Sequence, residues 1–240
     1  YTITGDNYFF LNFYTLPVVD KNKKSGAGTT DDFPTFFVSQ YTFFHYYEMA
    51  KRLHLHCALM KARSIGFSEI NAAIATNMFI SIRQSFTIIT CYDDKKLKRT
   101  YRKFTHALTF LDSKTDGGMF RLRQLEDSAL TKKSGRWENI NGQKVASGFQ
   151  STVAGVNGSD PGNIRGDRVD LIIYDEAGSW PDLTTAVIQG QELVEVQGIP
   201  RGIMMFGGTG GDKGKNLEGL RTIYYEPQAF KVLPYRHNFS

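Results

Sequence analysis

A predominantly apolar run at residues 169–174 ends directly in two adjacent carboxylates, Asp175 and Glu176. Such a run predicts a buried strand that delivers both acids to its C-terminal end. Further short apolar runs are separated by stretches with helical character, and this alternation predicts an α/β fold with a mostly parallel central sheet and helices on both faces. The other predicted strands are 56–60, 86–91 and 202–206, and the predicted helices include 33–52, 68–80 and a basic one from about 94 to 111. Asn141-Gly142 between extended stretches predicts a hairpin at 136–150, and the Gly- and Asn-rich residues 153–167 predict a long loop.

The composition is that of an ordinary globular protein. The 240 residues are 41% hydrophobic and 22% charged, and no linker divides them, so we expect a single domain over 1–240. Residues 1–32 would form an N-terminal extension with a Lys-, Ser- and Gly-rich loop at 20–32. No apolar run approaches the ~20 residues that cross a bilayer. Cys57 and Cys91 stand in apolar stretches without a C-x-x-C spacing, which favours buried thiols in a reducing compartment.

Residues 61–68, K-A-R-S-I-G-F-S, lie between a predicted strand and a predicted helix, where a phosphate-binding loop belongs. Gly66 and Ser68 fit the pattern G-x-x-x-x-G-K-S/T, but Lys61 replaces the first glycine and Phe67 replaces the lysine. A long cationic side chain from the start of the loop, Lys61 or Arg63, could still reach the phosphates. The alternative is an ordinary strand–turn–helix with solvated cations.

The acidic pair strengthens the nucleotide interpretation. At the C-terminal edge of a sheet, Asp175 could hold Mg²⁺ and Glu176 could orient or deprotonate a water molecule. The alternative is a pair of acids at a helix start. After the strand at 202–206, the glycine cluster at 207–211 contains Thr209, a hydroxyl that could sense the γ-phosphate; alone, that cluster is equally a glycine-rich loop.

In this order and spacing, the three motifs resemble the ATPase domain of viral terminase large subunits, such as those of tailed bacteriophages. The resemblance covers residues 33–211. That family shows a deviant phosphate loop, K-x-R-x-x-G-x-S, which Lys61, Arg63, Gly66 and Ser68 match. Asp175 is similar to the family's Mg²⁺ ligand, Glu176 to its catalytic carboxylate and Thr209 to its coupling motif. The nucleotide site that the resemblance implies comprises Lys61, Ala62, Arg63, Ser64, Ile65, Gly66, Phe67 and Ser68.

Two further residues, Arg165 and Gln40, resemble functional residues of the same family, and each has a simpler interpretation. Arg165 resembles an arginine finger that acts on a neighbouring subunit's ATP, although it could be a surface arginine in a glycine-rich loop. Gln40 resembles a glutamine that binds the adenine edge, although it could be a solvated helix residue.

The resemblance implies a P-loop (ASCE-type) NTPase fold, with ATP and Mg²⁺ as cofactors. It implies a homo-oligomeric ring that moves double-stranded DNA into a procapsid in the host cytoplasm, with the portal protein and the small terminase subunit as partners and no membrane. These large subunits normally continue into an RNase H-like nuclease. The chain ends about thirty residues after Thr209, so we expect that domain to be absent and these residues to have no nuclease activity.

A cluster of cations marks the predicted helix after residue 93, and a net charge of +5 is consistent with an anionic partner. One stripe of this helix suits sequence-independent contacts with DNA phosphates, although such runs are usually solvated faces. The predicted DNA-contacting residues are Lys95, Lys98, Arg99, Arg102 and Lys103.

Two other functions remain open. One is a helicase-like translocase of another superfamily, which would need a second RecA-like domain. The other is a catalytically inactive DNA-binding or assembly module that kept the fold, and Phe67 in the lysine position supports it.

Overall fold

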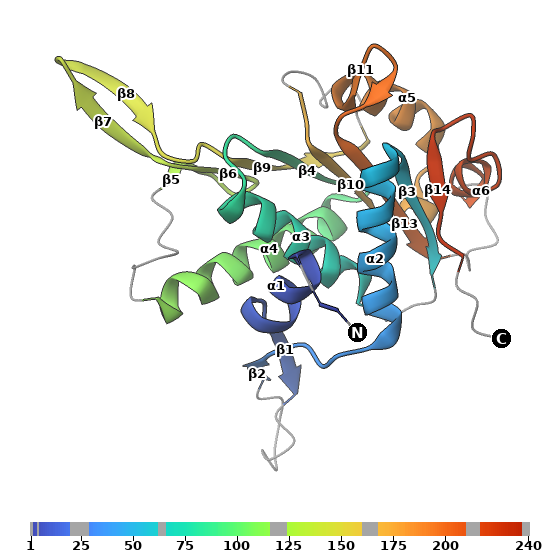
Figure 1. Ribbon diagram of the computed structural model, residues 1–240, viewed down its shortest axis with the longest axis horizontal. Coiled ribbons are helices and arrows are strands. Elements are labelled where there is room, and N and C mark those ends of the chain that lie inside the picture. The colour runs from blue at the N-terminus through green and yellow to red at the C-terminus, as the bar shows by residue number, and fades with distance from the viewer. Residues whose placement is uncertain are drawn as a thin grey trace.

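The computed structural model describes residues 2–3, 5–19, 29–61, 66–115, 124–159, 168–209 and 217–236. Its centre is an eight-stranded sheet with the order β14-β3-β13-β10-β4-β9-β6-β5 (Figure 1). Neighbouring strands from β14 to β9 are parallel, and β6 and β5 add an antiparallel edge. The strands are β3 (His56–Lys61), β4 (Phe86–Cys91), β5 (Gln124–Asp127), β6 (Thr131–Ser134), β9 (Thr152–Asn157), β10 (Leu171–Asp175), β13 (Ile203–Thr209) and β14 (Val232–Pro234).

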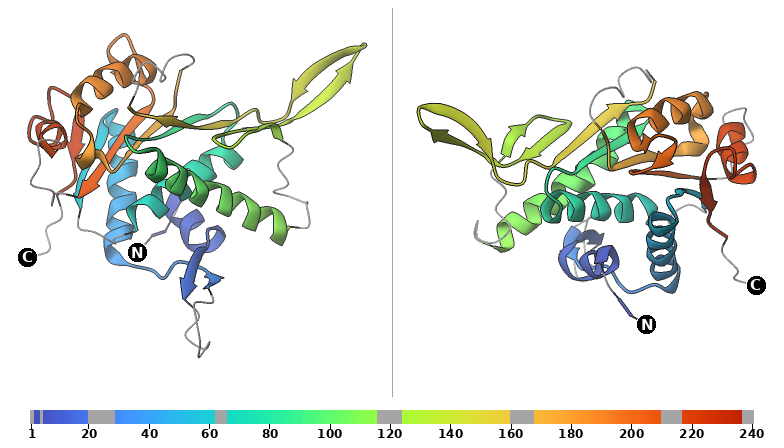
Figure 2. Two further views of the ribbon diagram at one scale, coloured as in Figure 1. Left: turned by 180° about the vertical axis from the view of Figure 1, so that it is seen from behind. Right: turned by 45° about the horizontal axis from the view of Figure 1, so that its top comes forward.

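Helices cover both faces of the sheet, as the alternating pattern predicts (Figure 2). Side chains of β10 alternate between two cores, with Ile173 facing one and Ile172 the other. The helices on the Ile173 side are α1 (Gly5–Phe13), α2 (Val38–Leu53), α3 (Phe67–Ser81) and α4 (Asp94–Lys114), and those on the Ile172 side are α5 (Leu183–Val194) and α6 (Leu217–Tyr225). No helix within the described ranges is long and apolar enough to span a membrane.

The start of α4 follows from its sequence. The Asp93 carboxylate accepts a hydrogen bond from the Lys96 backbone N–H at 2.8 Å, which caps the helix, and Asp94 stands in the first turn. The buried residues of this helix are mostly apolar and recur every three or four positions, so they share one face. The cations therefore lie on the opposite face. The buried residues of α4 are Leu97, Thr100, Tyr101, Phe104, Ala107, Leu108 and Leu111.

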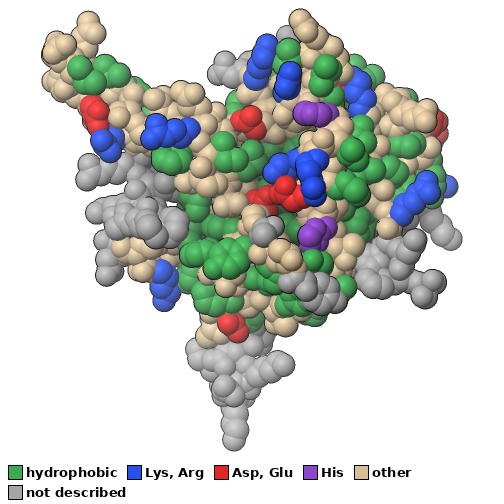
Figure 3. Space-filling view, in the orientation of Figure 1, with side chains coloured by type: hydrophobic (Ala, Val, Ile, Leu, Met, Phe, Trp, Pro, Cys, Tyr) green, Lys and Arg blue, Asp and Glu red, His purple; other side chains and the backbone are tan. Residues whose placement is uncertain are grey.

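The predicted hairpin at 136–150 is confirmed. Strands β7 (Arg136–Ile140) and β8 (Gln143–Ser147) form a separate two-stranded sheet among the described residues and project from the body of the molecule (Figure 1). Asn141 and Gly142 both have positive φ, as the tight turn requires. This arm carries exposed Trp137 and Ile140 among charged side chains (Figure 3).

Three expectations differ from the structure. The helix predicted over 33–52 begins only at Val38. The long loop predicted after residue 153 is wrong over its first part, because Thr152–Asn157 forms β9 inside the main sheet. Gly155 allows this strand to pack, since a Cβ there would lie 3.0 Å from Leu130 and 3.1 Å from Tyr101. Residues 29–32, expected in a loop, form β2 (Thr29–Asp32), which pairs with β1 (Leu16–Val19).

Both cysteines are buried and unpaired, as predicted.

Candidate nucleotide-binding site

The phosphate-loop strand and the acidic strand end at the same edge of the sheet. Strand β13 lies between them, parallel to both. Its Thr209 is in register with Lys61 at the end of β3, and its Gly207 is in register with Asp175 at the end of β10. The segment predicted as a phosphate loop therefore starts at the same edge of the sheet as the acid pair.

The Asp175 side chain lies on the face of the sheet that α3 and α4 cover, as Ile173 two residues earlier does. It is only 1% exposed. One carboxylate oxygen, Oδ2, accepts a hydrogen bond from the Thr100 hydroxyl at 2.7 Å, and Oδ1 accepts one from the Glu176 backbone N–H at 3.0 Å. Among the described residues no Lys, Arg or His forms an ion pair with it. A buried carboxylate without a countercharge has the chemistry of a cation ligand.

Glu176 adopts the left-handed backbone conformation, with φ 52° and ψ 37°. It is half-buried and precedes a short 3-10 helix, η2 (Ala177–Ser179), whose Ser179 N–H donates to the Glu176 carbonyl at 2.8 Å. A non-glycine residue in this region costs about 1 kcal/mol or more, and such residues concentrate at functional sites.

At the other end of the site, Gly66 caps α3 with a left-handed backbone, φ 79° and ψ 12°. The first N–H groups of a helix have no partner within the helix, and such a helix start can bind an anion. Ser68, the predicted hydroxyl ligand, lies half-buried in the first turn. The rest of the loop, Ala62, Arg63, Ser64 and Ile65, lies outside the described residues.

Phe67 is 2% exposed, and its ring packs over the bare backbone of β13. A Cβ at Gly207 would stand 1.9 Å from Cε1 of this ring, so only glycine leaves room for it. The ring of Phe43 meets it edge-on, with centroids 5.6 Å apart. The Lys61 ammonium lies over the same ring, 5.6 Å from its centroid. The residue in the lysine position thus supports the displaced lysine through a cation–π contact.

Gln40 of α2 lies against the loop. Its Nε2 stands 3.1 Å from the position of a Cβ on Gly66, and its Oε1 is buried without a hydrogen-bond partner among the described residues. A buried amide oxygen with no partner is costly, and a bound donor would satisfy it.

The second glycine of β13, Gly208, lets the short helix η2 that follows Glu176 pack against this strand. A Cβ at Gly208 would lie 2.3 Å from the backbone N of Gly178 in η2. The sequence favours a glycine-rich loop directly after residue 206. That prediction is partly wrong, because Gly207 and Gly208 belong to β13. Thr209 is the last residue of that strand and is half-buried. Arg165 and Gly210 lie outside the described residues.

Two residues near the candidate site, Thr100 and Glu69, were not predicted from the sequence. Thr100 lies on the buried face of α4 and carries no motif. Glu69, in the first turn of α3, accepts a hydrogen bond from the Tyr14 hydroxyl at 2.6 Å and pairs with Lys103 at 3.0 Å. An acid in the first turn of a helix was the only available signal for it.

The predicted DNA-contacting cations divide into two groups. Lys95, Lys98, Arg99 and Arg102 are exposed on α4, although Lys98 pairs with Asp94 at 2.6 Å. Lys103 is three-quarters buried and is held by Glu69.

No protein-family model matches the sequence, and no curated protein matches it. The sheet order, the strand-to-helix loop at β3 and the acids after β10 define the fold of a P-loop NTPase. Solved structures identify the fold more closely as that of the ATPase domain of phage large terminases.

The HK97 bacteriophage large terminase matches with a TM-score of 0.61 and 12% identity, over 95% of this chain and 42% of that one. A variant of the Thermus phage P74-26 large terminase ATPase domain matches at 0.52 and 16%, over 75% of this chain and 68% of that one. The large terminase of the thermophilic bacteriophage D6E, in complex with ADP, matches at 0.51 and 12%, over 84% and 45%. The chain thus spans less than half of two of these proteins.

Proposed function

We propose that this chain is the ATP-hydrolysing motor domain of a DNA-packaging terminase, which moves double-stranded viral DNA into a procapsid. The observation that carries the proposal is the common edge of the sheet at which Lys61 ends β3 and Asp175 ends β10, on either side of β13. The fold shared with a large terminase that binds ADP supports a nucleotide at this edge.

In this proposal Lys61 and Arg63 bind the phosphates, and Ser68 and Asp175 hold Mg²⁺. The ion would neutralise charge on the transferring phosphoryl group. Glu176 orients the attacking water, and Thr209 responds to the state of the nucleotide. Arg165 would complete the site of a neighbouring subunit in a homo-oligomeric ring.

Double-stranded DNA is the proposed cargo, with the portal protein and the small terminase subunit as further partners. The exposed cations of α4 supply the contacts to phosphates, which suits a motor that must hold any sequence. Lys95, Arg99 and Arg102 are exposed and form no ion pair within the part of the chain that the structure describes.

The test compares wild type with Glu176→Gln in Mg·ATP binding and in ATP hydrolysis with duplex DNA. We expect wild type to hydrolyse ATP, and Glu176→Gln to bind it normally while turnover falls roughly 10²- to 10⁴-fold, since the glutamine cannot accept a proton. Glu226→Gln, on the exposed surface after α6, is the matched control and should hydrolyse as wild type does.

Binding of duplex DNA without any Mg·ATP binding would contradict the proposal and favour the inactive DNA-binding module.

A further inference from the structure

Helix α4 has two faces with different chemistry. Its exposed face carries Lys95, Arg99 and Arg102, and its buried face includes Thr100, which is 2% exposed. The Thr100 hydroxyl reaches the end of β10 and donates to Asp175 Oδ2 at 2.7 Å. One helix therefore presents cations to solvent and a hydroxyl to the buried acid.

This hydrogen bond is unusual for a threonine in a helix. Such hydroxyls generally return to the carbonyl four residues earlier in their own helix. Thr42, Thr76, Thr109 and Thr222 do so here, at 2.7 to 3.0 Å. Thr100 instead bonds to a different element, so its hydroxyl serves Asp175 rather than the helix.

The bond also determines where Asp175 points. The Glu176 N–H holds Oδ1 and the Thr100 hydroxyl holds Oδ2, so both oxygens are held in place. Each carboxylate oxygen can accept a second partner, which leaves one lone pair per oxygen for a cation. Groups that orient a metal ligand in this way typically change metal affinity 10- to 100-fold when they are removed.

We propose that Thr100 is a positioning residue that aims the Asp175 carboxylate at the metal and makes the metal site sensitive to what α4 binds. This inference rests on the proposed function. A polyanion on Lys95, Arg99 and Arg102 would shift α4, and the buried hydroxyl would carry that shift to Asp175. By linkage, Mg·nucleotide must then change the affinity for the polyanion by the same factor.

The test measures binding of a fluorescent DNA duplex by anisotropy, with and without Mg²⁺ and a non-hydrolysable ATP analogue. Thr100→Val removes the donor at constant shape, and Thr100→Ser restores it. Thr109→Val, on the same helix, removes a hydroxyl that bonds only within the helix. Circular dichroism confirms folding, and Thr100→Ala replaces Thr100→Val if the latter unfolds.

In wild type, Mg·analogue should change duplex affinity by roughly 5- to 150-fold. In Thr100→Val this factor should fall toward one, and the Mg²⁺ concentration for half-maximal analogue binding should rise roughly 10- to 100-fold. Duplex affinity without nucleotide should stay unchanged. Thr100→Ser and Thr109→Val should behave as wild type does.

Wild-type coupling and wild-type Mg²⁺ dependence in Thr100→Val would overturn this inference and leave the proposed function standing. A wild-type chain that binds no Mg·analogue would overturn both.

Discussion

The Lys61 ammonium lies 5.6 Å from the centroid of the Phe67 ring. Phe67, which occupies the usual lysine position of the loop motif, is thus in contact with the lysine at the start of the loop. The ring itself cannot move freely, because Phe43 packs edge-on against it and Gly207 lies beneath it. Position 67 is thus part of the core, and the cation of this loop comes from its first residue.

Restoring the usual phosphate-loop sequence with Phe67→Lys should therefore damage the protein. The new ammonium would enter a site that is 2% exposed and lined by Phe43 and Gly207, with no acid described against it. Burial of an unpaired charge should lower the free energy of unfolding by about 3 kcal/mol or more. Chemical denaturation measures this loss.

Phe67→Leu is the control for that experiment. It keeps the site apolar and should cost about 1 kcal/mol in stability, while nucleotide affinity falls because Lys61 loses its aromatic partner. A stable Phe67→Lys variant that binds ATP more tightly would show that position 67 faces the phosphates.

The salt dependence of DNA binding should separate the α4 cations. Arg99→Ala and Arg102→Ala should each reduce the magnitude of the negative slope of log K against log salt by about 1, because each would remove one phosphate contact. Lys103→Ala should leave the slope unchanged, since Glu69 already holds that ammonium at 3.0 Å. Wild-type slopes in Arg99→Ala and Arg102→Ala would show that these two residues do not contact DNA phosphates.

Gln40 should govern the choice of base. Its buried Oε1 has no partner among the described residues, and a glutamine amide can pair with the edge of adenine. Gln40→Leu should reduce the preference for ATP over GTP about 10-fold, since one such pair contributes roughly 1–3 kcal/mol. Competition binding measures the preference. Ser39→Ala, an exposed neighbour on α2, is the control, and an unchanged ratio in Gln40→Leu would refute the role.

Stability should depend on pH through His56, which has no exposed surface. Its Nδ1 accepts a hydrogen bond from the Met204 N–H at 3.2 Å, so the proton of the neutral ring is on Nε2. Burial lowers the pKa of His56 from 6.5 to about 4, despite the opposing effect of Glu195. Between these values only the unfolded chain binds the proton.

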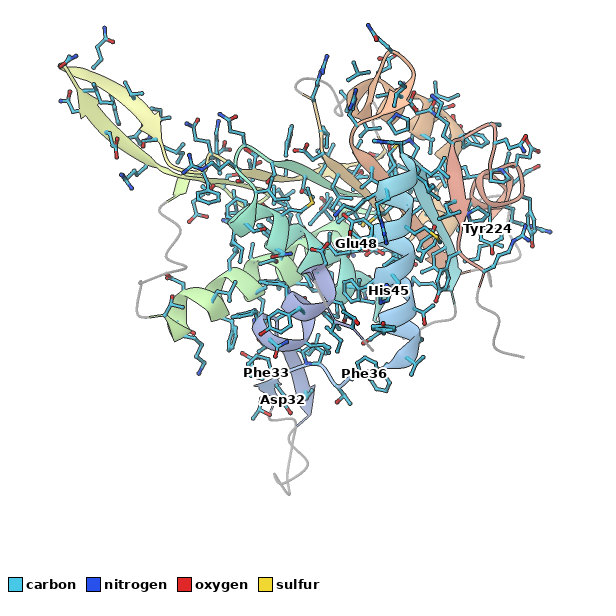
Figure 4. The ribbon with its side chains drawn as sticks, in the orientation of Figure 1. Asp32, Phe33, Phe36, His45, Glu48 and Tyr224 are labelled. Atoms are coloured by element: carbon cyan, nitrogen blue, oxygen red, sulfur yellow. The ribbon has the colours of Figure 1, made fainter. Side chains whose placement is uncertain are left out.

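The free energy of unfolding should therefore fall as the pH drops from about 6.5 to about 4, by roughly 3 kcal/mol. His56→Asn keeps an acceptor for Met204 but cannot titrate, so its stability should change less over this range. His45→Gln, exposed on α2 (Figure 4), should keep the wild-type pH dependence. Parallel pH profiles for wild type and His56→Asn would contradict the assignment.

Much of the central architecture was predictable because it is encoded locally. The predicted strand at 86–91 coincides with β4, and the predicted helix at 68–80 differs from α3 by one residue at each end. Strands that are buried on both faces are continuously apolar in sequence. Residues that tolerate positive φ, such as Gly66 and Asn141, indicate where turns occur.

What could not be predicted depends on contacts between distant segments. Gly207 and Gly208 resemble a turn, but they form a strand because Phe67 and Gly178 occupy the space of the missing side chains. Thr100 is an unremarkable helix residue until the β10 strand brings Asp175 to its hydroxyl. The short strands β5 and β6 carry little periodic signal, and their pairing is set by the sheet they extend.

At Glu176, the backbone conformation favours glycine for stability, whereas the proposed function requires the carboxylate. Glycine enters the left-handed region without penalty, so Glu176→Gly would relieve conformational energy of about 1 kcal/mol while it removes the carboxylate. A search for thermostable variants would thus tend to select the loss of this acid, and any that gain stability at position 176 should be screened for turnover before they are kept.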